Sequence, residues 1–420
     1  MDPTTIILGL AVVFGLYMAW NIGANDVANA MGTSVGSHAV TIGQAIFIAA
    51  IFEFGGAFLV GGEVTNTIRK GIFDASLFAD KPFEFNVGML SALLAAAVWL
   101  QLASWKGLPV STTHAIVGAV MGFSIVSMGW SSINWWKVGG IVASWFISPI
   151  TGAFIAFLVF FTIRRLILDD DEPIERTRKV APALVFVLGT VLGFILFKKG
   201  LKNLHLGLSG VELTGLAVAM GIGGSIAVGV MLRNFKKEEK DSHLRQNLKV
   251  EKVFAWLQIV TACFMAFAHG SNDVANAVGP LAGIVANLNS AAGEVATQAA
   301  LPKWVLALGG VGIVIGLATW GKKVIATVGK NITEMTPTRG FAAEFGACIT
   351  ILFGSTLGLP LSTTHVLVGS VIGVGLARGI AALNIGVIRG IAASWFITVP
   401  AGGVLCVIFY EILVHVLPRG

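Results

Sequence analysis

The sequence predicts an all-α polytopic membrane protein, with about 12 transmembrane segments arranged as two inverted-topology repeats. Low charge, long apolar runs and recurring motifs are the observations behind this prediction. Of the 420 residues, 55% are hydrophobic and only 12% are charged, and the mean hydropathy is +0.85. A soluble domain usually has about 25% charged residues. So little charge cannot cover a water-facing surface, which excludes a duplicated soluble fold.

Apolar segments follow one another along the whole chain. A transmembrane helix needs roughly 20 predominantly apolar residues. The segments can be drawn at 4–22, 43–62, 87–105, 110–128, 137–163, 181–197, 210–232, 253–269, 304–320, 340–357, 361–378 and 387–416. We expect the shorter or glycine-rich segments to form broken helices or re-entrant hairpins at the midplane. The 52 glycines suit such helices and close helix packing.

The distribution of Lys and Arg predicts the orientation, because cytoplasmic loops carry an excess of both residues. With the N-terminus outside, most of the 28 Lys and Arg residues fall in inner loops, and the opposite orientation would reverse this ratio. The longest polar stretch, 233–252, is then a charged cytoplasmic loop with no helical apolar stripe. We therefore expect an integral protein of the plasma (inner) membrane with both termini outside.

Motifs of the first half return in the second half in the same order. The pairs are GANDVANA (23–30) and GSNDVANA (270–277), LPVSTTH (108–114) and LPLSTTH (359–365), and SWFIS (144–148) and SWFIT (394–398). Their nearly constant spacing predicts a first repeat over 1–165 and a second over 253–420. Two transmembrane segments and the charged loop link them within 166–252. An odd number of segments precedes the second copy, so it enters the membrane from the other side. Transporters built in this way bind substrate near the midplane, between the copies.

An Asn-Asp-Val-Ala-Asn sequence follows directly on an apolar segment in each half, which places a carboxylate at membrane depth. Such a carboxylate costs roughly 2.5–3.5 kcal/mol to insert and therefore indicates a function. We expect the flanking glycines to let the helix unwind, so that backbone carbonyls and side chains supply oxygen ligands to a small cation. The candidate ligands are Asp26, Asn29, Asp273 and Asn276. A polar clamp between helices is the alternative, but two copies favour the cation site.

Proline followed by hydroxyl residues predicts a capped helix start within each half. The first turn of a helix leaves backbone N–H groups unsatisfied and carries partial positive charge, which suits an anion. Hydroxyl donors add to this in both halves. They are Ser111, Thr112 and Thr113, and Ser362, Thr363 and Thr364. Two such termini can surround one tetrahedral oxyanion, whereas plain capping is the alternative. No Lys or Arg recurs with the motif, so bound cations would neutralise the anion.

Further ionisable residues lie in the apolar segments. We interpret His114 and His365 as hydrogen-bond partners that orient the hydroxyl residues, with a proton relay as the alternative. Ser-x-x-His also suggests a nucleophile and a base, but the chain has no G-x-S-x-G elbow, so we do not expect an enzyme. Glu53 and Glu344 have no counterpart in the other half. They are candidate functional residues, or protonated groups that join two helices by a hydrogen bond.

The paired motifs resemble those of the inorganic phosphate transporter (PiT) family, and the resemblance covers essentially the whole chain. The stretch 51–72 is similar to the branch of sodium-dependent phosphate symporters. The resemblance implies sodium-driven phosphate uptake, a homodimer, and roles for individual residues. It assigns sodium to Asp26, Asn29, Asp273 and Asn276, and coupling to Glu53 and Glu344. It assigns phosphate to Asn25, Ser111, Thr112, Thr113, Asn272, Ser362, Thr363 and Thr364.

We therefore predict a secondary active symporter that imports inorganic phosphate with sodium by alternating access. Its partners are phosphate, sodium as a co-substrate and the lipid bilayer, with no cofactor and no nucleic acid. A proton-coupled symporter of phosphate, metal-phosphate or sulfate is the alternative within the same family. A phosphate-regulated channel or sensor is the alternative from a different class.

Overall fold

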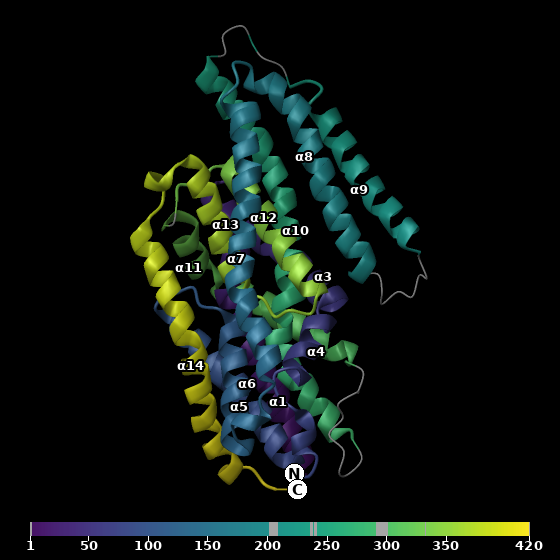
Figure 1. Ribbon diagram of the computed structural model, residues 1–420, viewed down its shortest axis with the longest axis vertical. Helices are drawn as coiled ribbons and strands as arrows, with labels where there is room; N and C mark the ends of the chain where they lie inside the picture. Colours follow the sequence, from purple (N-terminus) through teal and green to yellow (C-terminus); the bar gives the residue numbers. More distant parts are fainter. Residues whose placement is uncertain are drawn as a thin grey trace.

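The computed structural model describes residues 2–200, 209–235, 238, 242–290, 301–331 and 333–419, and these are almost entirely helical (Figure 1). The helices are α1 (Pro3–Asn25), α2 (Val27–Gly36), α3 (Ile42–Val60), α4 (Gly62–Lys70), α5 (Pro82–Trp105), α6 (Thr112–Met128), α7 (Trp135–Ile163), α8 (Pro173–Ile195), α9 (Gly210–Met231), α10 (His243–Leu288), α11 (Lys303–Asn331), α12 (Pro337–Thr356), α13 (Thr363–Arg378) and α14 (Ile385–Val416). The β-structure of the described residues is one isolated bridge between Phe73 and Ile133. The predicted all-α class is confirmed.

Each predicted apolar segment falls on a helix. Among the described residues, 9 helical stretches are long and apolar enough to cross a membrane, which confirms a polytopic membrane protein. Helices α6 and α13 are too short to do so, with 17 and 16 residues. At 1.5 Å per residue each spans about 25 Å, less than the roughly 30 Å of the hydrocarbon core. They are the second arms of the hairpins α5–α6 and α12–α13.

The predicted charged loop over 233–252 was wrong in its second part. Helix α10 begins at His243, and the Ser242 side chain caps it by accepting a hydrogen bond from the Arg245 amide. Gln246 and Val250 are buried, and the stripe they begin continues into the apolar part of the helix. A helix can carry many charges on its exposed side while such a stripe packs inward, and the dense charges of this stretch concealed the periodicity.

Helices from the two halves of the chain exchange partners. Helix α1 packs on α11, whereas α10 packs on α3; in the same way α6 packs on α14 and α7 on α13. Helices α8 and α9 pack mainly on each other. Both termini lie at the bottom end of the molecule in Figure 1, and α10 runs along most of its length. The hairpin ends at the starts of α6 and α13 are therefore enclosed by helices of both halves.

Two glycines make the crossings of α1 with α11 and of α10 with α3 equivalent. A Cβ atom at Gly23 would overlap the carbonyl oxygen of Ile313, and one at Gly270 would overlap the carbonyl oxygen of Glu53. Only glycine allows backbones to approach this closely. Because Gly23 and Gly270 are matching residues of the repeated motif, Glu53 holds in one crossing the place that Ile313 holds in the other.

Candidate functional site

The starts of α6 and α13 lie side by side in the interior. Ser111 caps α6 by accepting a hydrogen bond from the His114 amide at 3.2 Å, and Ser362 caps α13 through the His365 amide at 3.3 Å. The Thr113 hydroxyl donates to the Leu361 carbonyl at 2.9 Å, which joins the two hairpins. All six hydroxyl residues that the sequence singled out are buried. The structure therefore brings both predicted helix starts together.

The hydroxyls of these helix starts donate to the carboxylates of both Asn-Asp motifs. Asp26 accepts from Thr112 at 2.7 Å and from Thr364 at 2.8 Å, so one carboxylate holds a hydroxyl from each hairpin. Asp273 accepts from Thr363 at 2.6 Å. Hydrogen bonds to a charged acceptor are the stronger kind. The site is therefore one interlocked cluster made by both halves of the chain.

Three buried amides complete the cluster and present oxygen atoms. The Asn25 amide nitrogen donates to Ser104 Oγ at 2.7 Å and to the Leu108 carbonyl. The matching Asn272 donates to Ser355 Oγ at 3.0 Å and to the Leu359 carbonyl. Asn276 donates to the hydroxyls of Thr112 and Thr113. Because a carbonyl can only accept, the nitrogen positions of Asn25 and Asn272 are fixed.

The amide oxygens of Asn25, Asn272 and Asn276 are buried and have no hydrogen-bond partner among the described residues. A buried oxygen without a donor is costly, and a hard cation is one partner that relieves this cost. Asn25 and Asn272 were predicted to contact phosphate, but their N–H groups are engaged by the protein. Their free acceptor oxygens fit a cation better than an anion. The side chain of Asn29, the fourth predicted sodium residue, lies outside the described part of the structure.

The predicted unwinding of the motif helices was wrong. Asp26 interrupts the first copy by a single residue, between α1 and α2, and its amide still donates to the Ile22 carbonyl at 2.8 Å. The second copy lies within α10, which continues through Asp273 without a break. The flanking glycines serve close helix packing instead. Side-chain oxygens, and not backbone carbonyls, are therefore the available cation ligands.

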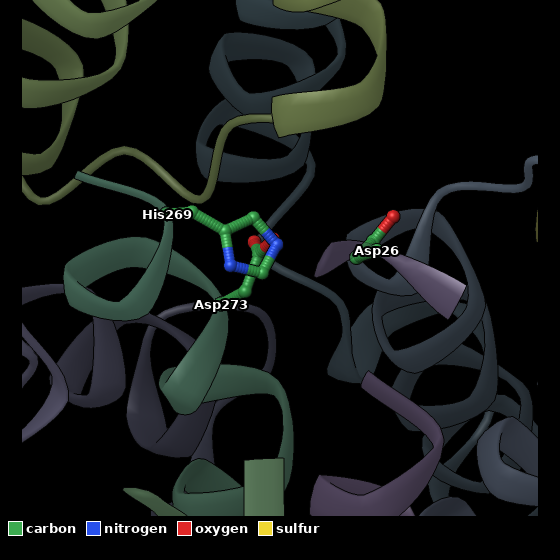
Figure 2. Close-up of side chains that lie close together, drawn as sticks. All are labelled: Asp26, His269 and Asp273. Atoms are coloured by element: carbon green, nitrogen blue, oxygen red, sulfur yellow. The ribbon is translucent and has the colours of Figure 1, made fainter. Parts of the chain in front are cut away.

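An acid–imidazole chain that the sequence analysis missed leads into the second copy. His269 Nδ1 lies 2.7 Å from Glu53 Oε2, and its Nε2 lies 2.7 Å from Asp273 Oδ2, with all three side chains fully buried. Figure 2 shows Asp26 across from His269 and Asp273, and ligand atoms of these three residues lie within 4.8 Å of one another. Ile22 occupies the position of His269 in the first copy. This difference between the copies was the signal for the missing residue.

Glu344 is buried beside α2 and α10 and accepts hydrogen bonds from four side chains. The donors are Thr33 at 2.7 Å, Ser34 at 2.5 Å, Gln258 at 3.0 Å and Thr261 at 2.5 Å. An ionised carboxylate has enough lone pairs for all of them, and the Gln258 amide nitrogen can only donate. Glu344 of α12 is thus joined to α2 and α10 by hydrogen bonds, and both readings of it, as a coupling residue and as a protonated group that joins helices, stay predictions. The sequence predicted Glu344 but none of its four donors.

The side chains of His114 in α6 and His365 in α13 contact each other and so connect the two hairpins. Their Nδ1 atoms lie 3.2 Å from the Trp395 carbonyl and 3.4 Å from the Trp145 carbonyl. Each imidazole also lies against the other tryptophan ring, and the two imidazole centroids are 4.4 Å apart. A carbonyl accepts only, so each Nδ1 carries the proton. This four-ring cluster fits the orienting role that we had favoured over a proton relay.

Comparisons with known proteins agree with this architecture. The model of the phosphate transporter family matches residues 22–406. A putative phosphate permease of Haemophilus influenzae is 46% identical over 408 residues, covering 96% of each chain. The chloroplastic inorganic phosphate transporter 2-1 of Arabidopsis thaliana is 44% identical, covering 99% of this chain and 73% of its own. A solved structure described as the sodium-dependent phosphate transporter superposes with a TM-score of 0.89 at 39% identity, covering 98% of this chain and 100% of that one.

Proposed function

Since this chain belongs to the phosphate transporter family, we propose that it is a secondary symporter that imports inorganic phosphate together with sodium by alternating access. Members of this family are transporters and not enzymes. Sodium coupling is supported by the name of the similar solved structure. The observation that carries the proposal is the cluster in which the starts of α6 and α13 share Asp26.

Phosphate binding is assigned to the two helix starts. Their backbone N–H groups and the hydroxyls of Ser111, Thr112, Thr113, Ser362, Thr363 and Thr364 are donors, as a tetrahedral oxyanion requires. The threonine hydroxyls can turn from the carboxylates to the anion when it enters. Such a site gains selectivity from donor geometry and not from a fixed positive charge.

The electrostatics of this site support the proposal that sodium binds with the anion. Two like charges about 5 Å apart repel each other by roughly 3 kcal/mol at an effective dielectric constant of about 20. An anion next to Asp26 and Asp273 is therefore unfavourable unless cations bind with it. No Lys or Arg stands within either Asn-Asp motif or either Ser-Thr-Thr motif. The proposed sodium ligands are Asp26, Asn29, Asp273 and Asn276, joined by the free amide oxygens of Asn25 and Asn272.

Proton coupling is the second candidate, and the acid–imidazole chain favours it. Glu53, His269 and Asp273 are joined by contacts of 2.7 Å and end at the site. Such a chain can hold and pass one proton. If sodium is the coupling ion, the acid–imidazole chain would instead link sodium binding at Asp273 to movement of α3. Glu344 would likewise link sodium binding to movement of α2.

Alternating access is assigned to the two halves, which we propose to be inverted repeats. We propose that α1 with α11 rotates relative to α10 with α3 and thereby opens either side, and the exchange of helix partners supports this proposal. We propose that the protein lies in the plasma (inner) membrane as a homodimer with both termini outside. The segment 233–252 is then cytoplasmic.

Uptake of labelled phosphate into proteoliposomes tests the proposal. An inward sodium gradient should drive accumulation above equilibrium, whereas lithium, potassium or an imposed proton gradient should not. Accumulation that needs a proton gradient and is abolished by an uncoupler would establish the second candidate instead. Equal competition by sulfate would contradict phosphate selectivity, and flux without accumulation would indicate a channel.

A further inference from the structure

His269 adds a nitrogen atom to the carboxylate oxygens of Asp26 and Asp273. All three side chains are buried, and ligand atoms of the three lie within 4.8 Å of one another (Figure 2). His269 Nε2 lies 2.7 Å from Asp273 Oδ2, but this contact lacks hydrogen-bond geometry, and Nε2 has no hydrogen-bond partner among the described residues. A buried nitrogen atom without such a partner is costly. A hard cation such as sodium prefers oxygen ligands and does not relieve this cost.

Glu53 orients the imidazole from the other side of the ring. Its Oε2 atom lies 2.7 Å from His269 Nδ1. An ionised carboxylate only accepts hydrogen bonds, so with Glu53 ionised the proton stays on Nδ1 and Nε2 keeps a free lone pair beside the two aspartates. Metal-binding histidines nearly always donate their second N–H in this way, which fixes the tautomer and makes the free nitrogen a stronger ligand. Ile22 and Ile313 stand at the matching places of the first copy, so this arrangement adjoins Asp273 only.

We propose that Asp26, His269 and Asp273 bind a divalent transition-metal ion of the Zn²⁺ and Co²⁺ class, and that this ion blocks sodium-driven uptake. Imidazole and carboxylate together are ligands that such ions prefer, whereas Mg²⁺ and Ca²⁺ prefer oxygen ligands alone. The two ionised aspartates carry two negative charges, which one divalent ion offsets. The block rests on the proposed function, because Asp26 and Asp273 are the proposed sodium ligands and the metal ion would take their place in the site.

Equilibrium binding of Co²⁺ to the purified full-length protein in nanodiscs tests the metal site. The buffer contains choline in place of sodium and no phosphate, and the visible absorption of Co²⁺ reports whether nitrogen and oxygen ligands surround it. We expect one ion per chain, bound at least 100-fold more tightly than Mg²⁺. Equal affinities for Co²⁺ and Mg²⁺ would overturn the proposal, because the imidazole would then not be a ligand.

Three variants test the individual ligands. His269→Gln removes the nitrogen ligand and should abolish Co²⁺ binding, whereas Glu53→Gln leaves all ligands in place and should weaken it about 10- to 100-fold. Asp26→Asn should weaken it at least tenfold, which tests the ligand from the first half. The matched control is His415→Gln, since His415 is an exposed histidine near the end of α14. Native Co²⁺ affinity in a folded His269→Gln or Glu53→Gln variant would overturn the proposal. Loss of binding in His415→Gln alone would do so as well, because it would show a surface site.

Competition with sodium tests the block. Added sodium should raise the Kd for Co²⁺, since the two ions share the aspartates, and free Co²⁺ above its Kd should reduce the initial rate of sodium-driven phosphate uptake into proteoliposomes. A Kd that sodium does not change, or uptake that bound Co²⁺ does not slow, would refute the block.

The two proposals fail in different ways. Normal sodium-driven uptake in metal-free buffer by a protein that does not bind Co²⁺ would overturn the metal site alone. Co²⁺ binding that depends on His269, in a protein without sodium-driven uptake, would support the metal site and contradict the proposed function.

Discussion

The two copies of the Asn-Asp motif make matching contacts with the hairpins. Asn25 donates to Ser104 as Asn272 donates to Ser355. The carboxylates likewise accept from Thr112 and from Thr363. We call Asn25, Asp26, Asn272 and Asp273, together with the hairpin residues that they contact, the shared layer. Because both copies keep these contacts, we assign binding of the substrate and its cations to the shared layer.

The surroundings of the two aspartates are different. His269 and Glu53 stand next to Asp273, whereas the matching positions next to Asp26 are Ile22 and Ile313. Glu344 also differs from its counterpart. Ser104 and Ser355 are matching residues, and the residue that stands as far before Ser104 as Glu344 stands before Ser355 is Leu93. Glu53 and His269 therefore stand beside the second copy of the motif only, although Glu53 itself comes from the first half of the chain, whereas Glu344 lies beside α2, which follows the first copy. The difference suggests that binding is symmetric and that coupling depends on the second copy.

We expect the largest effect from substitutions that disrupt the contacts common to both copies of the motif. Asp26→Asn and Asp273→Asn each remove the carboxylate of a proposed sodium ligand. We expect sodium-driven uptake to fall about 100-fold in each, since a charge–charge interaction of about 3 kcal/mol corresponds to a factor of this size. The initial rate of labelled phosphate uptake measures this, with the exposed Asp171→Asn as control. Normal sodium-driven uptake in either variant would show that the ion assignment is wrong.

The next effect tests the difference between the copies. His269→Ile leaves Glu53 buried without its partner, which should cost about 3–5 kcal/mol of stability and reduce uptake at least tenfold. Glu53→Ile together with His269→Ile copies the first motif's surroundings and should recover the thermal stability but not the transport. Recovery of both melting temperature and uptake in the double variant would reduce the acid–imidazole chain to a structural role.

A smaller effect compares two threonines of the hairpins. Thr364 donates to the Asp26 carboxylate, whereas Thr113 donates to a backbone carbonyl. A hydrogen bond to a charged group contributes about 1.5–3 kcal/mol, and a neutral one about 0.5–1.5 kcal/mol. The KM for phosphate should rise about tenfold in Thr364→Val and about threefold in Thr113→Val. Thr364→Ser should restore it, and an equal effect of both valine variants would argue against the shared carboxylate.

The smallest effect concerns the four-ring cluster, which is alike in both halves. His114→Asn and His365→Asn should each reduce uptake about threefold, because an asparagine amide can still donate to the tryptophan carbonyl. The dependence of uptake on pH between about 6 and 8 should keep its shape if the histidines only orient the hydroxyls. A flattened pH profile in either variant would support a proton relay.

The repeated motifs predicted the shared layer well, because the same residue types recur in both halves. The sequence located the short helices α6 and α13, the buried hydroxyls of Ser111 and Ser362, and the two aspartates. It could not show that Asn25 and Asn272 use their N–H groups within the protein, since that depends on the hairpin backbones at Leu108 and Leu359.

The residues that were missed are those that differ between the halves. His269 matches an isoleucine, so a search for recurrence passes over it. The donors to Glu344 come from α2 and α10, and only tertiary packing brings them together. The continuity of α10 through Asp273 reflects packing of its glycines against α3 and α4, which local glycine content cannot distinguish from unwinding.

Equilibrium binding of phosphate to the purified protein, with sodium or with choline, tests the central claim most directly. The claim is that cations at the aspartates offset the charge of the anion at the joined helix starts. It predicts at least tenfold tighter phosphate binding in sodium, and by linkage an equal gain for sodium in phosphate. Asp273→Asn should lose this dependence. The same Kd for phosphate in sodium and in choline would contradict the claim.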